Sequence, residues 1–165
     1  MLFGIPIIVI LIIFIAFTFE FINGFHDTAN AVATTVSTKS LEPFQAIAVS
    51  AIFNLLGALS GTAVAITIAQ GFANPNFATD VVVLAALLSA ICWNLVTWAI
   101  SIPSSSSHAL IGGLVGAIIF EHGFTSIKYQ AVMHKVLIPM VVFPILGFII
   151  AAIITIIIKK FLFCT

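Results

Sequence analysis

The sequence carries very little charge. Only 6% of its 165 residues are charged, arginine is absent, and five lysines balance five acidic side chains. Soluble domains carry about 25% charged residues, so this scarcity, together with 62% hydrophobic residues, excludes a water-soluble core. Without a basic patch, nucleic acid is also excluded as a partner. We therefore interpret residues 1–165 as a single transmembrane domain in contact with membrane lipid, with no soluble domain.

Cysteine is nearly absent as well. Cys92 lies inside an apolar segment and Cys164 is the penultimate residue, so neither predicts a disulfide framework or a metal site. We expect no cofactor. The first 19 residues lack both a basic region and a small-residue cleavage signal, so we interpret them as a retained span rather than a signal peptide.

What the chain has in abundance is long apolar runs, which predict an all-α integral membrane protein. The predicted spans cover residues 2–22, 44–69, 81–101 and 136–158, and a shorter apolar run covers residues 109–120. Because Pro103 and a run of serines separate the third span from the short run, residues 81–120 are expected to form a broken or re-entrant helical hairpin. This gives about three transmembrane helices plus the hairpin, or five hydrophobic segments if both arms cross.

Several local signals set the expected boundaries of these elements. Pro43 is expected in the first turn of the second helix, and Thr79 is expected to cap the third. Residues 70–79 form a turn-rich loop in this interpretation, and residues 121–135 are polar enough to lie outside the bilayer. Pro139 and Pro144 are expected to bend the last span.

A polar stripe emerges where the first apolar run ends. If this segment is helical, one face carries Glu20, Asn23, Asp27, Asn30 and Thr34. Gly24 would instead make a local break easy, which is tolerated at membrane depth only where the backbone is buried in protein or lines a wet cavity. Acidic residues inside spans usually mark ion or substrate paths, although Asp27 could also lie past the helix end among lipid headgroups.

Four consecutive hydroxyls after Pro103 open the short helix, namely those of Ser104, Ser105, Ser106 and Ser107. Free backbone N–H groups and the helix dipole favour anion binding there, although a serine-rich surface turn is the plain alternative. Asp27 would repel such an anion, and no arginine or intramembrane lysine compensates. The pattern therefore predicts co-transport with a cation, either a proton on Asp27 or a Na⁺ held by Asp27, Asn23, Asn30 and backbone carbonyls.

These segments carry a resemblance. The run from Asn23 to Ala31 resembles the G-x-x-D-x-A-N-A signature of the inorganic phosphate transporter (PiT) family, and the segments from Trp93 to Trp98 and from Pro103 to His108 resemble its second signature. The form Gly24-Phe25-His26-Asp27 is most similar to the bacterial low-affinity branch. The resemblance covers nearly the whole chain and implies uptake of phosphate, or of a neutral metal phosphate, with protons across the cell membrane, which is the inner membrane in a bacterium.

The resemblance also implies roles for individual residues. Asp27 and Asn30 become ion or phosphate ligands, and Ser104, Ser105, Ser106 and Ser107 become phosphate ligands. Glu20 and Asn23 are assigned to cation or proton coupling together with Asp27 and Asn30. The residues expected to support this binding site are His26, Thr34, Asn94, Thr97 and His108.

The chain departs from the family in length. The family combines inverted repeats, each with one such motif and one serine-rich hairpin, whereas this chain is about half as long and holds one copy of each. We expect an inverted-repeat half that needs a second repeat or an antiparallel homodimer, and a non-transporting half-subunit or a truncated fragment is the alternative. Lys39, Lys159 and Lys160 fall on one side and Lys128 and Lys135 on the other, so positive charge does not fix the orientation.

A membrane enzyme is the remote alternative. Ser107, His108 and Asp27 superficially offer the three groups of a serine hydrolase. Adjacent residues at one helix start point in different directions, and triads depend on converging geometry. We therefore expect a transporter and not an enzyme.

Overall fold

The computed structural model describes residues 5–61, 71–73 and 75–162 and is built from helices. Four of the described helices are long and apolar enough to cross a membrane: Ile7–Ser37, Pro43–Ser60, Asp80–Ala99 and Tyr129–Phe161. The expected all-α membrane class is therefore confirmed. The chain divides into two compact units, Met1–Ile127 and Lys128–Thr165, and the first unit contains both signature segments. The expected end of the second span, together with Gln70 and Asn74 of the expected loop, lies outside the described residues.

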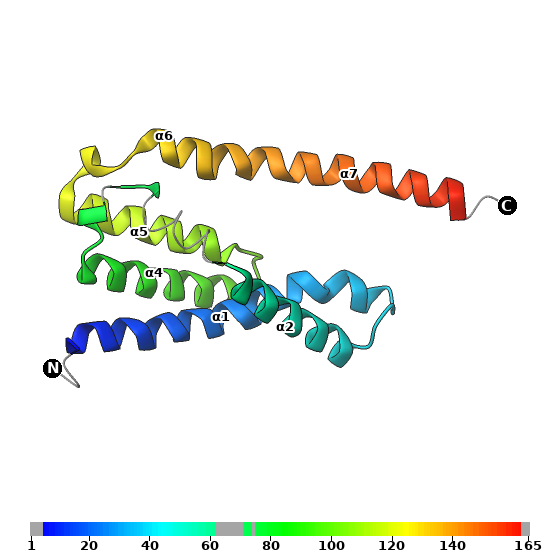
Figure 1. Ribbon diagram of the computed structural model, residues 1–165, viewed down its shortest axis with the longest axis horizontal. Helices are drawn as coiled ribbons and strands as arrows, with labels where there is room; N and C mark the ends of the chain where they lie inside the picture. Colours follow the sequence, from blue (N-terminus) through cyan, green and yellow to red (C-terminus); the bar gives the residue numbers. More distant parts are fainter. Residues whose placement is uncertain (1–4, 62–70, 74, 163–165) are drawn as a thin grey trace. The chain divides into compact units, whose positions relative to one another are not determined.

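Helix α1 runs without interruption over Ile7–Ser37 (Figure 1). Its 31 residues extend about 46 Å at 1.5 Å per residue, which exceeds the roughly 30 Å of a bilayer core. Gly24 lies inside the helix, so the break that it would permit is not found. The helical alternative is correct, and the helix places the stripe of Glu20, Asn23, Asp27, Asn30 and Thr34 on one face.

Helix α2, Pro43–Ser60, begins as expected with proline in its first turn. The backbone N–H of Glu42 donates to Oε1 of Gln45 at 3.3 Å, which satisfies a donor at the helix start. A short turn joins α1 to α2, and Lys39 takes a left-handed conformation in it, with φ of 57°. This turn returns the chain so that α2 contacts α1.

Helices α4, Asp80–Ala99, and α5, Ser106–His122, form an antiparallel hairpin (Figure 1). Thr79 caps α4 as expected, accepting a hydrogen bond from the N–H of Val82 at 3.3 Å. The serines open the short helix as expected, and the Ser105 hydroxyl caps it by accepting from the N–H of His108 at 3.3 Å. Two of the four serines therefore lie within the first turn of α5.

The core of the first unit lies where α1 meets this hairpin. Phe19 of α1 packs against Leu87 and Ala90 of α4, and seven residues further along α1 the ring of His26 contacts Thr97. Contacts thus advance in the same direction on both helices, so α1 and α4 run parallel. The start of α5 is thereby placed beside the middle of α1, where the polar stripe begins.

Close approach of the two hairpin arms depends on Gly113. A Cβ atom added at Gly113 would lie 2.7 Å from the backbone oxygen of Ala86 and 2.9 Å from the hydroxyl of Ser89. Atoms at these distances overlap, and the backbone oxygen cannot move without shifting α4. A Cβ at Gly112 would meet nothing within 4 Å.

The second unit is one long helical segment. It comprises α6, Tyr129–Val132, a π-helical turn, Met133–Leu137, and α7, Ile138–Leu162. Helical backbone thus begins seven residues before the expected start of the last span, because the apolar residues Ala131, Val132 and Met133 extend it. The π-helical turn ends two residues before Pro139. In a regular α-helix the proline ring would clash with the carbonyl group four residues earlier. The expected bends stay predictions.

We predict that Gly113→Ala destabilises the hairpin by about 1 to 3 kcal/mol, because it overpacks the contact with Ala86. Gly112→Ala is the matched control and should be neutral or stabilising by up to about 1 kcal/mol, because alanine favours the helix. Unfolding of the purified protein in detergent measures both. Equal stability of the two variants would contradict the close packing at Gly113.

Candidate functional site

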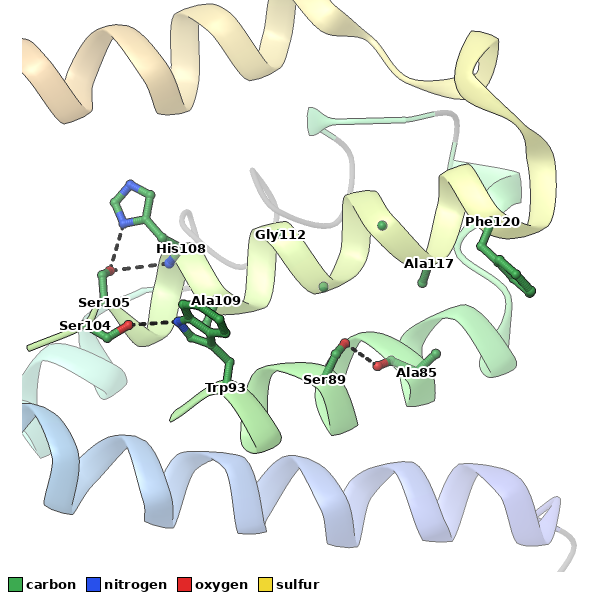
Figure 2. Close-up of a pocket in the computed structure, with 12 residues that line it drawn as sticks. Ala85, Ser89, Trp93, Ser104, Ser105, His108, Ala109, Gly112, Ala117 and Phe120 are labelled. Carbon is green, nitrogen blue, oxygen red and sulfur yellow. Dashed lines mark hydrogen bonds between the residues drawn. The ribbon is translucent and has the colours of Figure 1, made fainter. Parts of the chain in front are cut away.

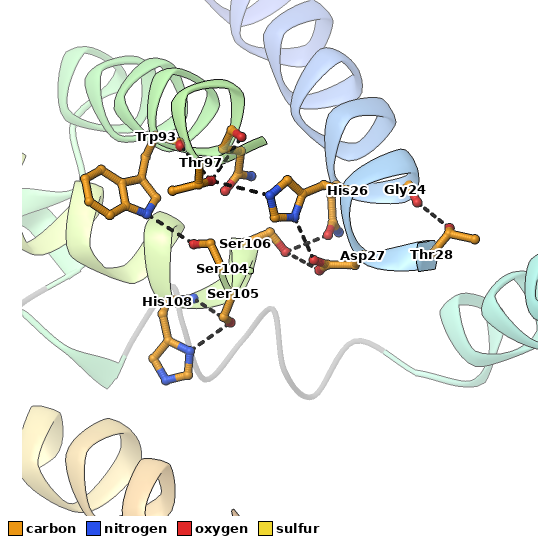
Figure 3. A network of polar contacts seen from close by, with 12 residues as sticks. Gly24, His26, Asp27, Thr28, Trp93, Thr97, Ser104, Ser105, Ser106 and His108 are labelled. Carbon is orange, nitrogen blue, oxygen red and sulfur yellow. Dashed lines mark hydrogen bonds and ion pairs between the residues drawn. The ribbon is translucent and has the colours of Figure 1, made fainter. Parts of the chain in front are cut away.

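The carboxylate of Asp27 is contacted on both oxygens (Figure 3). Its Oδ1 lies 3.2 Å from Nδ1 of His26, and its Oδ2 lies 2.6 Å from the hydroxyl of Ser106 at the start of α5. The His26 side chain is 5% exposed, whereas that of Asp27 is 43% exposed. Asp27 is therefore anchored on its buried side and accessible on the other.

His26 connects Asp27 to helix α4. Its Nε2 lies 3.4 Å from the hydroxyl of Thr97, which also donates to the backbone oxygen of Trp93 at 3.0 Å. When the Thr97 proton is used in that way, Nε2 of His26 must be the donor to Thr97. Neutral histidine then has no proton on Nδ1, and the contact with Asp27 needs one more proton.

The Ser106 hydroxyl joins the two signature segments. It lies 2.6 Å from Oδ2 of Asp27 and also 2.6 Å from Oδ1 of Asn23, yet it has a single proton to donate. If Oδ2 of Asp27 carried a proton, it could donate to Ser106, and Ser106 could then donate to Asn23. The alternative turns the Asn23 amide, but this would place its oxygen against Oε2 of Glu20, to which Nδ2 now donates at 3.4 Å. Ser106 thus lies between two oxygen acceptors, one from Asn23 and one from Asp27.

Among the described residues, the other three serines make no hydrogen bond to Asp27. The indole N–H of Trp93 donates to Ser104 at 3.2 Å, and the Ser105 hydroxyl lies 2.8 Å from Nδ1 of His108 (Figure 2). These four residues line a pocket of about 800 Å³ along the hairpin, which we call the hairpin pocket. Ser107 instead lines a separate cavity of about 510 Å³, beside α1.

The hairpin pocket is built from small side chains as well as polar ones. Along α5 its floor consists of Ala109, Gly112, Gly113, Gly116 and Ala117. At one end lie the hydroxyls of Ser104 and Ser105, next to the first turn of α5, whose backbone N–H groups have no acceptor within the helix. That end can bind an anion through hydroxyl and N–H donors.

Asn94 is buried on the face of α4 that packs against α1. Its side chain is 0% exposed, and neither its Nδ2 nor its Oδ1 has a partner among the described residues. A buried amide without partners is costly and marks a position where water, an ion or a substrate group completes the site. It lies one helical turn before Thr97 on the same buried face of α4, and is therefore next to the contact between Thr97 and His26.

A second helix contributes polar groups that the sequence interpretation did not assign to the site. Residues of α1 and α2 line a groove of about 780 Å³, which we call the α1–α2 groove. Its polar residues are Glu20, Asn23, Asp27 and Thr28 from α1, and Ser50 and Asn54 from α2. The three- and four-residue spacing of polar and small residues on α2 was the available signal, but it predicts helix packing equally well.

Two residues of the predicted stripe lie apart from these contacts. Asn30 and Thr34 are exposed and lie further along α1, beyond the residues that reach Ser106. Their roles as ligands stay predictions. The arrangement also provides no hydrolase triad, because His108 pairs with Ser105 in the hairpin pocket while Ser107 lies in another cavity.

We predict that Ser106→Ala weakens the docking of α5 on α1 by about 1.5 to 3 kcal/mol, as expected for a hydrogen bond to a charged group. Ser107→Ala, at the neighbouring position, is the control and should cost less. Unfolding of both variants, alone and combined with Asp27→Asn, gives the coupling energy between the two positions. A coupling energy near zero between Ser106→Ala and Asp27→Asn would refute the contact between the two side chains.

We further predict that Asn94→Leu raises the stability of the fold, since replacing an unpaired buried amide by an apolar side chain of similar size removes a desolvation cost. Thermal unfolding in detergent measures the change. A loss of stability would mean that Asn94 has protein partners that the geometry does not contain.

Comparison with known proteins identifies the family of the chain. A model described as the phosphate transporter family matches residues 23–164. The chain is 48% identical over 155 residues to a probable low-affinity inorganic phosphate transporter of Bacillus subtilis (strain 168), covering 93% of this chain and 46% of the relative. It is 46% identical over 146 residues to one from Mycobacterium bovis, covering 88% of this chain and 35% of the relative.

A low-affinity inorganic phosphate transporter of Buchnera aphidicola is 40% identical over 157 residues, covering 88% of this chain and 32% of the relative. The chain thus spans less than half the length of these relatives. No solved structure matches it. The family match extends over most of the chain, from Asn23 in the first signature segment through the second, and so the chain belongs to the phosphate transporter family.

Proposed function

We propose that this multi-pass membrane protein provides one half of a carrier that moves inorganic phosphate across the cell membrane together with a cation at Asp27. The observation that carries the proposal is the contact between Asp27 and Ser106, because it joins the coupling carboxylate of one signature segment to the serine run of the other. The names of the relatives, which are phosphate transporters, support the substrate. Family membership also favours a carrier over a serine hydrolase.

Phosphate binds, in this proposal, at the polar end of the hairpin pocket. The hydroxyls of Ser104 and Ser105, the ring of His108 and the indole N–H of Trp93 all line this pocket. Free backbone N–H groups at the start of α5 add fixed donors, and the helix dipole contributes about half a positive charge. Donors that are fixed in the fold suit a dianion, and they discriminate little between free phosphate and a metal phosphate.

Coupling follows from competition for the start of α5. Ionised Asp27 is itself an anion at this helix terminus, so it reduces the positive potential that phosphate would use. A cation on Asp27 removes this competition, and phosphate in turn favours the cation-bound form. The two ligands thereby bind with positive cooperativity, which is the thermodynamic requirement for co-transport.

A proton fits the present geometry better than Na⁺. A proton on Oδ2 of Asp27 can be donated to Ser106, whose own proton is then free for Oδ1 of Asn23, so one added proton completes these two contacts. Uptake that depends on Na⁺ at constant pH would identify Na⁺ as the coupling ion instead.

The hairpin of α4 and α5 is the element that we propose to be re-entrant. Helix α5 has 17 residues, about 26 Å, and begins with the polar serine run rather than with a headgroup anchor. A second inverted repeat, or a second copy in antiparallel orientation, would supply the matching half of the site. Liposomes that contain the chain alone, and the chain with a second half taken from a full-length relative, separate a carrier from a non-transporting half-subunit.

We predict that Asp27→Asn makes phosphate binding independent of the proton on this side chain. The ratio of wild-type to variant affinity should therefore depend on pH, because Asp27 can take up a proton whereas the amide at this position cannot. Binding of radiolabelled phosphate to the purified protein across a pH series measures this. The free phosphate titrates identically for both proteins, so an unchanged pH profile in the variant would contradict the role of Asp27.

We also predict that replacing Ser104 and Ser105 together by alanine weakens phosphate binding by about 0.5 to 1.5 kcal/mol for each hydrogen bond lost, and by more for bonds to the dianion. The double variant of Ser60→Ala with Thr155→Ala is the control outside the pocket, because these hydroxyls donate only to the backbone of their own helices. Equal phosphate affinity in the two double variants would show that the anion binds elsewhere.

A further inference from the structure

The α1–α2 groove has a consistent chemical character. Its charged groups are the carboxylates of Glu20 and Asp27, and no lysine or histidine is among the residues that line it. The remaining polar groups are the amides of Asn23 and Asn54 and the hydroxyls of Thr28 and Ser50. Such a lining attracts cations and repels anions.

The orientation of Asn54 strengthens this character. Its Nδ2 donates to the backbone oxygen of Ser50 at 2.9 Å, and because a carbonyl oxygen can only accept, the amide cannot be turned the other way. The amide oxygen is therefore the end left to accept. Asn54 thus presents an oxygen as its available group in a groove that already contains two carboxylates.

The groove also reaches the accessible side of Asp27. His26 and Ser106 contact the carboxylate from α1 and α5, and neither of them lines the groove. Asp27 itself does line it, together with Asn23. A cation that moves along the groove can reach Asp27 without passing the hairpin pocket, where Ser104, Ser105 and His108 lie.

We propose that the α1–α2 groove is a water-filled, cation-selective route to Asp27, and that Ser50 and Asn54 of α2 are specificity-determining residues of this route. The inference rests on the proposed coupling of a cation to phosphate movement, but it adds a second helix to the site. It also separates the two ligands in space, because the cation approaches between α1 and α2 while phosphate approaches along the hairpin.

Charge-selective labelling of cysteine tests the route. Asn54→Cys and Ser50→Cys are made in the full chain after Cys92 and Cys164 are changed to serine, and each variant is inserted into membranes. The rates of reaction with a trimethylammonium-ethyl and a sulfonatoethyl methanethiosulfonate are then compared. The same ratio for a small thiol in solution corrects for the different reactivity of the two reagents.

We expect the cationic reagent to be preferred about tenfold over the solution ratio, because two carboxylates at short range act through a partly protein environment. Glu20→Gln combined with Asp27→Asn should return the ratio to the solution value. Ser60→Cys is the matched control: Ser60 lies on the same helix, outside the groove, and its hydroxyl donates to the Gly57 oxygen at 2.7 Å. Neutralising the two carboxylates should leave its ratio unchanged.

The proposal is overturned if the cysteines at positions 50 and 54 react with neither reagent, or if they show the solution ratio with both carboxylates present. The readout needs no transport, so it is separate from the proposed function. Charge-selective labelling in a protein that fails to bind phosphate would retain the route and reject the substrate, whereas phosphate binding without selective labelling would do the reverse.

Discussion

The structure depends on a carboxylate held against the start of a helix inside an apolar protein. Asp27 and Ser106 are 79 residues apart in sequence, and their side chains meet at 2.6 Å. Within a membrane-spanning helix an ionised carboxylate needs polar partners, and a helix N-terminus with a serine hydroxyl is a favourable one. In the proposed mechanism the same terminus also binds the transported anion. One position would then serve two negative groups, and a cation would decide which of them is stabilised.

The rest of the first unit positions this contact. Parallel packing of α1 and α4 places His26 beside Thr97, and the antiparallel hairpin then returns the start of α5 to α1. Gly113 allows the hairpin arms to approach closely enough for this return. The apolar contacts of Phe19, Leu87 and Ala90 hold the helices at this register, so packing along the helices sets the geometry of the polar groups.

The sequence predicts the helices well and their polar contacts poorly. Apolar runs and the signals at Pro43 and Thr79 predict elements that the structure confirms, because these signals are local. The serine run was expected to open α5, but the sequence does not show which serine caps the helix, since serines fit both a loop and a first helical turn. The spacing of Asn23 and Asp27 predicts a shared face, but only the fold shows that Ser106 alone of the four serines meets them. The groove with Ser50 and Asn54 could not be predicted, because small and polar residues at such spacing also fit plain helix packing.

The contact between α1 and the start of α5 is the central claim, and cross-linking measures it most directly. Cysteines at positions 23 and 106, in a chain with Cys92 and Cys164 changed to serine, replace side chains whose oxygens lie 2.6 Å apart. We predict that mild oxidation in membranes joins them, while cysteines at positions 23 and 104 stay unlinked, because Ser104 lies with Trp93 in the hairpin pocket. Cross-linking of the 23–104 pair without the 23–106 pair would contradict the account.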